Sequence, residues 1–286
     1  MQKNMTRRPP WLVQRIPAGR DFNKVDKLMR GLGLHTVCRS AHCPNIGECF
    51  GSGTATFLIL GGVCTRRCGF CAVPKGHPKE VEIIEADNVA QAVAALGLKH
   101  AVITSVTRDD LPDGGAGHFA ACIAKVRKLN RATAVEVLTP DFGGDLTALA
   151  RVLAAEPAVF SHNIETVPRL YPSVRPEADY RRSLTVLQAA AQTGFSMVKS
   201  GIMVGLGETL EEVFAVFSDM VATGVTAVTV GQYLRPSLKH LPVVEYVHPD
   251  LFRYYEEKAY AAGLKKVASG PLVRSSYHAA TMAVTT

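Results

Sequence analysis

Long apolar runs are missing from this sequence. Of its 286 residues 47% are hydrophobic, yet no stretch approaches the ~20 consecutive apolar residues that cross a membrane. The basic residues 1–20 are not followed by the apolar core of a secretory signal, and Pro9 and Pro10 oppose the amphipathic helix of a mitochondrial presequence. We therefore expect a cytoplasmic protein that does not bind membranes.

Concentrated charge and a full set of cysteine pairs are also missing. The net charge of +7 is spread along the chain, without the lysine-rich run or aromatic-interleaved basic patch that binds nucleic acid. Seven cysteines cannot all pair, and the reducing cytoplasm disfavours disulfides. We expect no nucleic-acid partner, and the excess charge suits an acidic protein or an anionic substrate equally well.

Alternating strands and helices dominate what is present. From about residue 55 onward, short β-branched runs alternate with longer segments whose apolar residues recur every three or four positions. Strands separated by helices pair in parallel through right-handed crossovers. The predicted strands are 54–60, 101–106, 133–139, 158–164, 196–205 and 226–233, and the predicted helices are 85–98, 114–130, 145–156, 179–194 and 208–224.

These six strand–helix units are fewer than the eight of a complete (β/α) barrel. They suit either an incomplete (β/α)6 barrel of the TIM type or an open doubly wound sheet. Residues 249–269 add a further helix and a short strand. We expect one α/β structural domain in three parts: an N-terminal extension over 1–53, the core over 54–248 and a C-terminal segment over 249–286.

Three cysteines lie in the loop that follows the first predicted strand. Cys64, Cys68 and Cys71 have the spacing C-x3-C-x2-C in CTRRCGFC. Zinc sites usually combine two well-separated pairs of ligands, whereas three thiolates in one tight loop suit three irons of a cubane cluster. Phe70 would shield such a cluster, and Gly69 would let the backbone approach it. A reduced thiol cluster or a zinc knuckle is the competing interpretation.

Three further cysteines precede that strand. Cys38, Cys43 and Cys49 have the spacing C-x4-C-x5-C. His35 and His42 lie close in sequence and could complete a tetrahedral zinc site with them. The segment therefore predicts a metal site without deciding between zinc and an iron–sulfur cluster.

The C-x3-C-x-aromatic-C loop, placed after the first strand of a partial barrel, resembles the radical S-adenosylmethionine (SAM) superfamily. The resemblance implies an incomplete barrel in which the fourth iron of the cluster binds the amino and carboxylate groups of SAM. One electron from the reduced cluster then cleaves SAM to a 5′-deoxyadenosyl radical. Such a radical attacks a C–H bond that acid–base side chains cannot activate, and neither a Ser–His–Asp set nor a carboxylate pair is evident in the sequence.

Longer stretches resemble one family of that superfamily, lipoyl synthase. They are HTVCRSAHCPNIGECF, TATFLILGGVCTRRCGFCAV, ITSVTRDDLPDGGAGHF, HNIETVPRLYPSVRP, KSGIMVGLGET and GPLVRSSYHA, which together span roughly residues 30–279. The family inserts two sulfur atoms, at C6 and C8 of an octanoyl chain amide-linked to a lysine of a carrier domain. It consumes two SAM molecules per lipoyl group and takes the sulfur from an auxiliary [4Fe–4S] cluster.

The resemblance assigns two [4Fe–4S] clusters to this chain. Their cysteine ligands would be Cys64, Cys68 and Cys71 for the cluster that activates SAM, and Cys38, Cys43 and Cys49 for the auxiliary cluster. A serine of the stretch RSSY would complete the auxiliary site. We expect Ser276 to be this ligand, with Ser275 as the alternative. An oxygen ligand is more readily protonated than a thiolate, so its iron can detach first.

Five side chains are expected to contact the cofactor: Phe70, Thr104, Asn163, Glu165 and Arg235. Asn163 and Glu165 end the fourth strand with an amide and a carboxylate, which suit the ribose hydroxyls or the ammonium group of SAM. Arg235 ends the sixth strand and could hold a carboxylate. Three other side chains are expected on the surface: Tyr171, Arg175 and Tyr180.

The resemblance also implies partners. They are octanoylated carrier domains (the glycine-cleavage H protein or the E2 domains of 2-oxoacid dehydrogenases) and a flavodoxin or ferredoxin as reductant. Competing hypotheses are another sulfur-inserting radical SAM enzyme resembling biotin synthase, a two-cluster electron carrier and a zinc-stabilised binding module. The first would lack the N-terminal cysteine triplet, and the second has no need of a large α/β scaffold.

Overall fold

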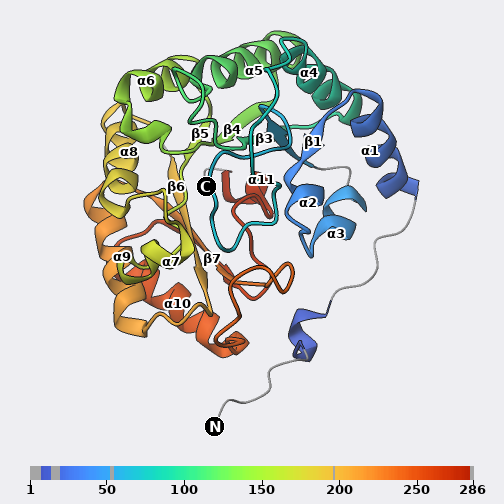
Figure 1. Ribbon diagram of the computed structural model, residues 1–286. Coiled ribbons are helices and arrows are strands. Elements are labelled where there is room, and N and C mark those ends of the chain that lie inside the picture. Colours follow the sequence, from blue (N-terminus) through green and yellow to red (C-terminus); the bar gives the residue numbers. More distant parts are fainter. Residues whose placement is uncertain (1–7, 14–19, 52–54, 196, 284–286) are drawn as a thin grey trace.

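The structure is a computed structural model that describes residues 8–13, 20–51, 55–195 and 197–283. Eight strands form one sheet in the order β1 to β8, in which β1 runs antiparallel to β2 and β2 to β8 are all parallel (Figure 1). The strands are β1 His35–Thr36, β2 Thr56–Ile59, β3 His100–Ser105, β4 Ala134–Leu138, β5 Val159–Ser161, β6 Val198–Val204, β7 Ala227–Gln232 and β8 Lys266–Gly270. The sheet curves as a barrel does (Figure 1). Among these described strands β1 and β8 remain edges that do not pair with each other, so the barrel is incomplete.

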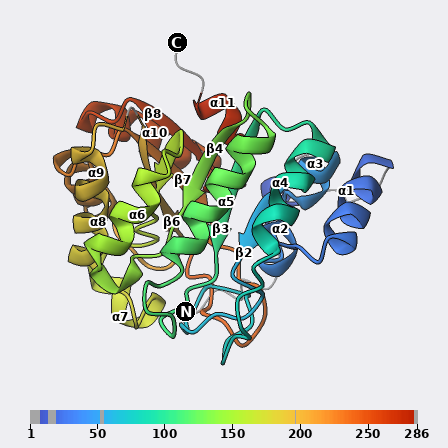
Figure 2. The same cartoon turned by 90° about the horizontal axis from the view of Figure 1, so that it is seen from above.

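Helices cover the outside of this barrel, and Figure 2 shows them lined up along the strands. The long helices are α1 Arg20–Gly31, α4 Glu85–Leu96, α5 Ala116–Leu129, α6 Leu146–Ala154, α8 Tyr180–Gln192, α9 Leu210–Ala222 and α10 Pro249–Ala262. The short ones are α2 Val37–Ser40, α3 Ile46–Gly51, α7 Tyr171–Val174 and α11 Ala279–Ala283. The five helices expected between residues 85 and 224 are confirmed, with ends within two residues of the predicted bounds.

Local capping explains where several helices begin and end. The Asp145 carboxylate accepts hydrogen bonds from the backbone N–H groups at the start of α6. Thr209 and Glu212 form a reciprocal capping box at the start of α9. Gly97 ends α4 in the left-handed conformation, with φ of 62°, which a glycine adopts without steric penalty. These signals are local in sequence, which is why the helix bounds could be predicted.

Side chains alternate between the two faces of the sheet. Val228 and Val230 of β7 are fully buried and belong to the main core, on the helix-covered side. Side chains from β3, β4 and β6 meet one another instead: Glu136 pairs with His100, at 3.0 Å, and with Lys199. Because β5 lies between β4 and β6, Glu136 and Lys199 can meet only on the concave side of the curved sheet. The interior of the barrel therefore holds buried charges as well as a small apolar cluster that includes Met282 of α11, while the main apolar core lies on the helix-covered side.

The C-terminal segment runs down through the barrel interior. At the carboxyl end of β7, the Val273 carbonyl passes so close to Gly231 that no side chain would fit there. At the amino end of β8, the Lys266 ammonium donates to the carbonyl of Met282, at 2.8 Å. Figure 1 accordingly shows α11 inside the ring of strands. The segment thus joins the two ends of the barrel from within.

The sheet confirms the expected architecture and adds to it. The six strands predicted between residues 54 and 233 are present as β2 to β7. The helix and short strand expected over 249–269 are present as α10 and β8, and β8 is the seventh parallel strand. The short strand β1 and the helices of the N-terminal extension were not predicted. Among the described residues, no helix has the length and apolar content needed to cross a membrane.

Candidate active site

The cysteine loop over residues 64–71 leaves β2 at the carboxyl end of the barrel. Hydrogen bonds from three other loops hold its main chain and one thiol. The Thr107 N–H donates to Cys64 Sγ at 3.3 Å. Gly69 donates its N–H to the Val174 carbonyl at 2.9 Å and accepts from the Leu241 N–H at 3.1 Å. The loop is therefore ordered by contacts from segments that are more than 30 residues away in sequence.

Gly69 and Phe70 each have a packing role in this loop. A Cβ on Gly69 would lie 2.9 Å from the Leu241 side chain and 3.1 Å from the Ser173 carbonyl oxygen, so only glycine fits without a shift. Phe70 packs against a small apolar cluster that includes Val174 and Tyr233. Phe70 was expected to shield a cluster, and the structure places it on the apolar side of the loop.

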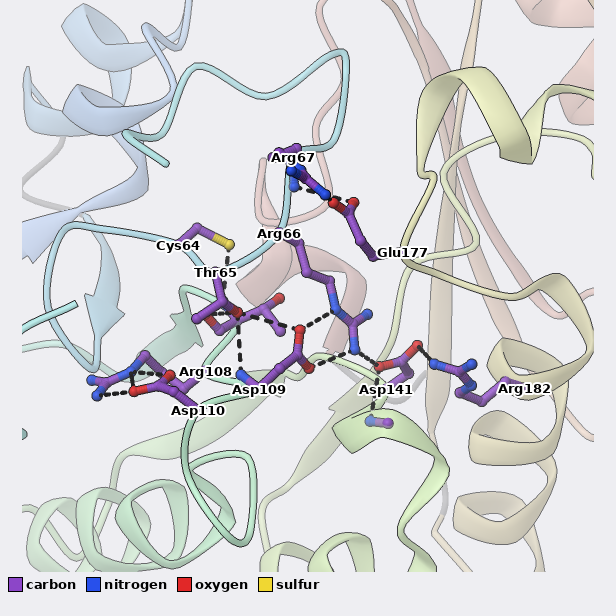
Figure 3. Close-up of polar contacts among 12 residues, drawn as sticks. Cys64, Thr65, Arg66, Arg67, Arg108, Asp109, Asp110, Asp141, Glu177 and Arg182 are labelled. Carbon is purple, nitrogen blue, oxygen red and sulfur yellow. Dashed lines mark hydrogen bonds and ion pairs between the residues drawn. The ribbon is translucent and has the colours of Figure 1, made fainter. Parts of the chain in front are cut away.

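A chain of alternating charges anchors the loop to the barrel (Figure 3). The Arg66 guanidinium, 5% exposed, donates to both oxygens of Asp109 at 2.8 Å and to Asp141 at 2.6 Å. Asp141 is fully buried and also accepts from Arg182 of α8 at 3.4 Å. Arg66 holds the pKa of the Asp141 carboxyl at about 2, although burial alone would raise it. The loops after β2, β3 and β4 are thereby tied together.

The thiols of the loop are close enough to influence one another's ionisation. Burial raises the pKa of Cys68 and raises that of Cys71 to about 11, and the neighbouring thiolates add to both shifts. The Arg175 guanidinium opposes the shift at Cys68. Within the described ranges no three Cys, His, Asp or Glu side chains are arranged to hold one metal ion. In a cubane cluster each thiolate binds its own iron.

The second triplet lies beside the start of β2. Cys38 is in α2 and Cys49 in α3, and the Thr56 N–H donates to the Cys38 sulfur. Burial raises the pKa of Cys38 to about 11 and that of Cys49 to about 12, and repulsion from the other thiolates of the triplet adds to both. Burial also raises the pKa of Cys43, while the positive charge of Arg274 opposes that shift. The three thiols thus form a second group of interacting sulfur atoms.

The two serines of the C-terminal segment face different partners. Ser276 Oγ accepts from Thr56 Oγ1 at 2.8 Å, and Thr56 also donates its N–H to Cys38. Ser275 Oγ accepts from Asn163 Nδ2 at 2.6 Å. Thr56 therefore links Ser276 to the N-terminal triplet, whereas Ser275 contacts the loop that follows β5.

Asn163 and Glu165 come together in a tight turn after β5. Asn163 Nδ2 donates to Glu165 Oε1 at 3.0 Å, while the buried Asn163 Oδ1 accepts no hydrogen bond from the residues that the structure describes. Glu165 has φ of 69°, a conformation that is strained for a residue with a side chain, and its N–H donates to the Gly201 carbonyl at 2.9 Å. Burial raises the pKa of Glu165, and the charges of Arg175 and Arg274 oppose that shift. A buried amide oxygen without a donor is free to accept one from a ligand.

The expectation that Tyr171, Arg175 and Tyr180 lie on the surface is wrong. Their exposed fractions are 5%, 8% and 7%. Arg175 Nη1 donates to the carbonyls of Asn163 and Ile164 at 2.9 and 3.0 Å, and so fixes the turn that carries Asn163 and Glu165. The turn has buried main-chain carbonyls that need donors, and an arginine about a dozen residues later supplies them. This long-range use of a charged side chain leaves no periodic signal in the sequence.

Thr104 and Arg235 are placed differently from Asn163. Thr104, in β3, donates its hydroxyl to the Leu138 carbonyl at 2.7 Å and is 7% exposed. Arg235 donates to the carbonyls of Leu238 and His240, at 2.6 and 2.8 Å, within its own loop. Both side chains lie at the carboxyl end of the barrel, and each already donates to main-chain carbonyls of the protein.

The amino-acid sequence is similar to those of known protein families. The model of the radical SAM superfamily matches residues 58–220, and that of the N-terminal domain of lipoyl synthase of the radical SAM family matches residues 1–43. Lipoyl synthase from Caldicellulosiruptor saccharolyticus is 56% identical over 273 residues, which cover 95% of this chain and 96% of the relative. Lipoyl synthase from Caldanaerobacter subterraneus subsp. tengcongensis is 55% identical, over 96% of each chain.

The chain belongs to the lipoyl synthase family. It is therefore an enzyme of the radical SAM type, a class that uses a [4Fe–4S] cluster and SAM. Membership of the lipoyl synthase family sets aside the electron-carrier and zinc-module hypotheses, and with them the hypothesis of a biotin synthase-like enzyme.

Solved structures resemble the chain in fold. SuiB from Streptococcus suis, bound to S-adenosylmethionine, has a TM-score of 0.59 at 10% identity and matches 79% of this chain and 53% of its own. Methylornithine synthase (PylB) has a TM-score of 0.51 at 14% identity, over 87% of this chain and 82% of its own. At such low identity the likeness concerns the architecture alone.

The residues of this lipoyl synthase family member fit the cofactors that its class uses. Six thiols form two interacting groups, and in the described part of the chain no donor reaches the buried Asn163 Oδ1. Arg66 and Arg274 were not assigned roles from the sequence. A hint for Arg66 was available, because aspartates follow two of the predicted parallel strands, at positions 109 and 141, on the same side of the sheet as the cysteine loop. For Arg274, whose charge acts on both Cys43 and Glu165, the sequence held no comparable hint.

Proposed function

We propose that this chain inserts two sulfur atoms, at C6 and C8 of an octanoyl-lysine on a carrier domain, and that an auxiliary [4Fe–4S] cluster supplies the sulfur. The observation that carries the proposal is the position of the C-terminal segment. Ser276 and Ser275 are adjacent, yet the first reaches Thr56 beside Cys38 and the second reaches Asn163. A substrate carbon near these serines would lie between the two cysteine groups.

The chain's own residues would bind and orient the reactants. Six cysteines and one serine would hold the two clusters: Cys64, Cys68 and Cys71 for one, and Cys38, Cys43, Cys49 and Ser276 for the other, with Ser275 as the alternative serine. When bound, the clusters and two SAM molecules supply the electrons, the hydrogen-abstracting radicals and the sulfur that acid–base side chains cannot provide.

Around those groups, protein side chains would set the geometry. Asn163 and Glu165 would receive hydroxyl or ammonium donors of SAM, and Arg175 would keep their turn in place. Thr104, Phe70 and Arg235 would act through the shape of the site, since the hydroxyl and guanidinium among them already donate within the protein. The C-terminal segment would fill the barrel interior and exclude water.

The partners, the reductant, the location and the division of the chain are also proposed. We propose carrier domains of the glycine-cleavage H protein or of 2-oxoacid dehydrogenase E2 components as substrates, flavodoxin or ferredoxin as the reductant, and a cytoplasmic location. We also propose the division into residues 1–53, 54–248 and 249–286. The pairing of β1 with β2 and of β8 with β7 supports treating these parts as one structural domain.

An anaerobic assay tests the proposed reaction. Reconstituted protein is incubated with dithionite, SAM and an octanoyl-lysine peptide, and the peptide is analysed by mass spectrometry. We expect a gain of two sulfur atoms together with 5′-deoxyadenosine. Cys38→Ala should still form 5′-deoxyadenosine but leave the peptide unchanged, while Cys122→Ala, in the fully buried core position of α5, should behave like the wild type. Sulfur insertion by Cys38→Ala would contradict the role of the second triplet.

A further inference from the structure

A loop after β7, over residues 234–241, rests directly on the cysteine loop. The His240 imidazole donates its Nε2 hydrogen to the carbonyl of Cys71 at 3.0 Å, since a carbonyl can only accept. The next residue, Leu241, donates its N–H to the Gly69 carbonyl at 3.1 Å and packs over Gly69. Two hydrogen bonds therefore join this loop directly to the segment that carries Cys68 and Cys71. A partner bound to the loop would lie next to that segment.

The tip of the loop is held in one conformation. Arg235 donates to the carbonyls of Leu238 and His240, and Ser237 Oγ donates to His240 Nδ1 at 2.9 Å. The Tyr233 hydroxyl donates to the Leu241 carbonyl at 2.8 Å. Such a loop loses little conformational entropy when a partner binds, which favours recognition.

This rigid tip presents an apolar side chain beside a positive charge. Leu238 is 87% exposed, and Lys239 is exposed next to it. Another exposed lysine, Lys75, donates to the carbonyl of Cys68 at 3.0 Å, so a second positive charge borders the same segment. The nearby Arg67 is neutralised by Glu177 at 2.9 Å. A single exposed leucine is ordinary, but a leucine on a rigid loop beside positive charges offers an apolar contact together with charges that attract an acidic partner.

We propose that Leu238, Lys239 and Lys75 form the docking surface for a small acidic one-electron carrier protein. The proposal rests on the proposed function, which needs electrons from outside the chain. In the docked complex the reduced carrier loses one electron and the cluster held by Cys64, Cys68 and Cys71 gains it, with no bond made or broken. Acidic side chains of the carrier would face the lysines, and an apolar contact would cover Leu238.

An octanoylated carrier domain is the competing occupant. That domain has to deliver its lysine arm toward the Asn163 and Ser275 side of the site, inside the barrel. The tip of the loop contacts the main chain of Gly69 and Cys71 instead. An electron donor needs only proximity to the cluster, so the contacts favour the donor.

The test compares two reductants on matched variants. The docking variant is Leu238→Ser with Lys239→Glu; Lys75 is left unchanged because it holds the Cys68 carbonyl. The control variant is Leu129→Ser with Lys128→Glu, an adjacent exposed leucine and lysine at the end of α5, away from the cysteine loop. Reconstituted proteins are incubated with SAM and with either an octanoyl-lysine peptide or an octanoylated carrier domain, and they receive electrons from reduced flavodoxin or from dithionite. The rate of 5′-deoxyadenosine formation and the Kd for flavodoxin, by calorimetry, are measured at low and high salt.

We expect the docking variant to lose about tenfold in flavodoxin-driven rate and in affinity at low salt, and to show a weaker salt dependence than the wild type. Its dithionite-driven rate and all rates of the control variant should stay within about twofold of wild type. Unchanged flavodoxin-driven rates and Kd would overturn the proposal. So would a loss seen with dithionite on an octanoylated carrier domain but not on the free peptide, which would assign the surface to that domain. Absence of 5′-deoxyadenosine from wild type with dithionite would instead refute the proposed function.

Discussion

At the scale of single residues, buried charges decide how the cysteine loop is held. Arg66 and Arg67 are neighbours in the loop, yet their environments differ. Arg66 lies between Asp109 and the fully buried Asp141, whereas the Arg67 side chain is 79% exposed and pairs with Glu177. Breaking a buried pair leaves an uncompensated charge, while an exposed pair exchanges its partner for water.

We therefore predict unequal effects for two equivalent substitutions. Arg66→Gln should lower the free energy of unfolding by about 3 kcal/mol, because Asp141 loses its main partner. Arg67→Gln should lower it by less than about 1 kcal/mol. Urea unfolding of the two variants measures both values. Equal effects would show that the charge network of Figure 3 does not anchor the loop.

A second matched pair is Ser276→Ala and Ser275→Ala. If Ser276 is the ligand of the auxiliary cluster, its loss should change the Mössbauer signal of one iron of that cluster and leave SAM affinity unchanged. Ser275→Ala should do the reverse, because Ser275 contacts Asn163. We expect SAM affinity to fall by about threefold to tenfold, as for the loss of one hydrogen bond. A changed Mössbauer signal in Ser275→Ala alone would exchange the two assignments.

At the scale of elements, the C-terminal segment depends on small residues in the strands that surround it. Gly231 of β7 is packed against the Val273 carbonyl, and Gly201 of β6 faces Ser275 Oγ at 3.0 Å from the place of a Cβ. Tyr277 then donates its hydroxyl to the Glu48 carboxylate of α3 at 2.9 Å. Strand, segment and N-terminal helix are thus coupled, although none of them is near another in sequence.

Gly231→Ala should displace the segment, because the new methyl group would overlap a backbone carbonyl that cannot rotate away. We expect trypsin to cleave after Arg274 at least about tenfold faster than in the wild type, since local opening exposes the bond. Gly31→Ala is the control, because no atom of the residues that the structure describes lies within 4 Å of a Cβ placed on Gly31. Equal cleavage rates in both variants would mean that the segment does not depend on this close approach.

At the scale of the whole molecule, stability is linked to pH through a buried histidine. His162 is 1% exposed, and its ring nitrogens bond the Thr139 carbonyl at 2.9 Å and Ser183 Oγ at 3.1 Å. Burial, with a smaller contribution from the charge of Arg175, lowers the pKa of His162 from 6.5 to about 4. Between these values the unfolded chain binds a proton that the folded chain does not, so stability falls as the pH is lowered through this window.

We predict that this histidine contributes about 2 kcal/mol to the loss of stability between pH 7 and pH 5. His162→Gln should flatten the dependence of the unfolding free energy on pH by that amount, even if it lowers stability at pH 7. The exposed His77, replaced by Gln, serves as the control and should keep the wild-type slope. Urea unfolding at several pH values measures the slopes, and parallel curves for wild type and His162→Gln would refute the assignment.

Seven strands, six helices and the lipoyl synthase family were predictable from the sequence, including α10 and β8 of the C-terminal segment. Strand and helix periodicities depend on neighbouring residues, and caps such as Asp145 act within one turn. The cysteine spacings are equally local, so both triplets could be recognised. The short strand β1 and helices α2 and α3 escaped prediction because they are two to six residues long and depend on packing against β2 and α1.

What the sequence by itself determined is therefore the order of the elements and the chemistry that their cysteine motifs can support. Only the tertiary structure decided which side chains meet. Thr56 and Ser276 are 220 positions apart, and Asn163 and Ser275 are 112 apart. Such pairs are brought together by the curvature of the sheet and by the path of the C-terminal segment through its interior, which no local pattern encodes. For the same reason Arg175, expected on the surface, is a buried support of the active-site turn.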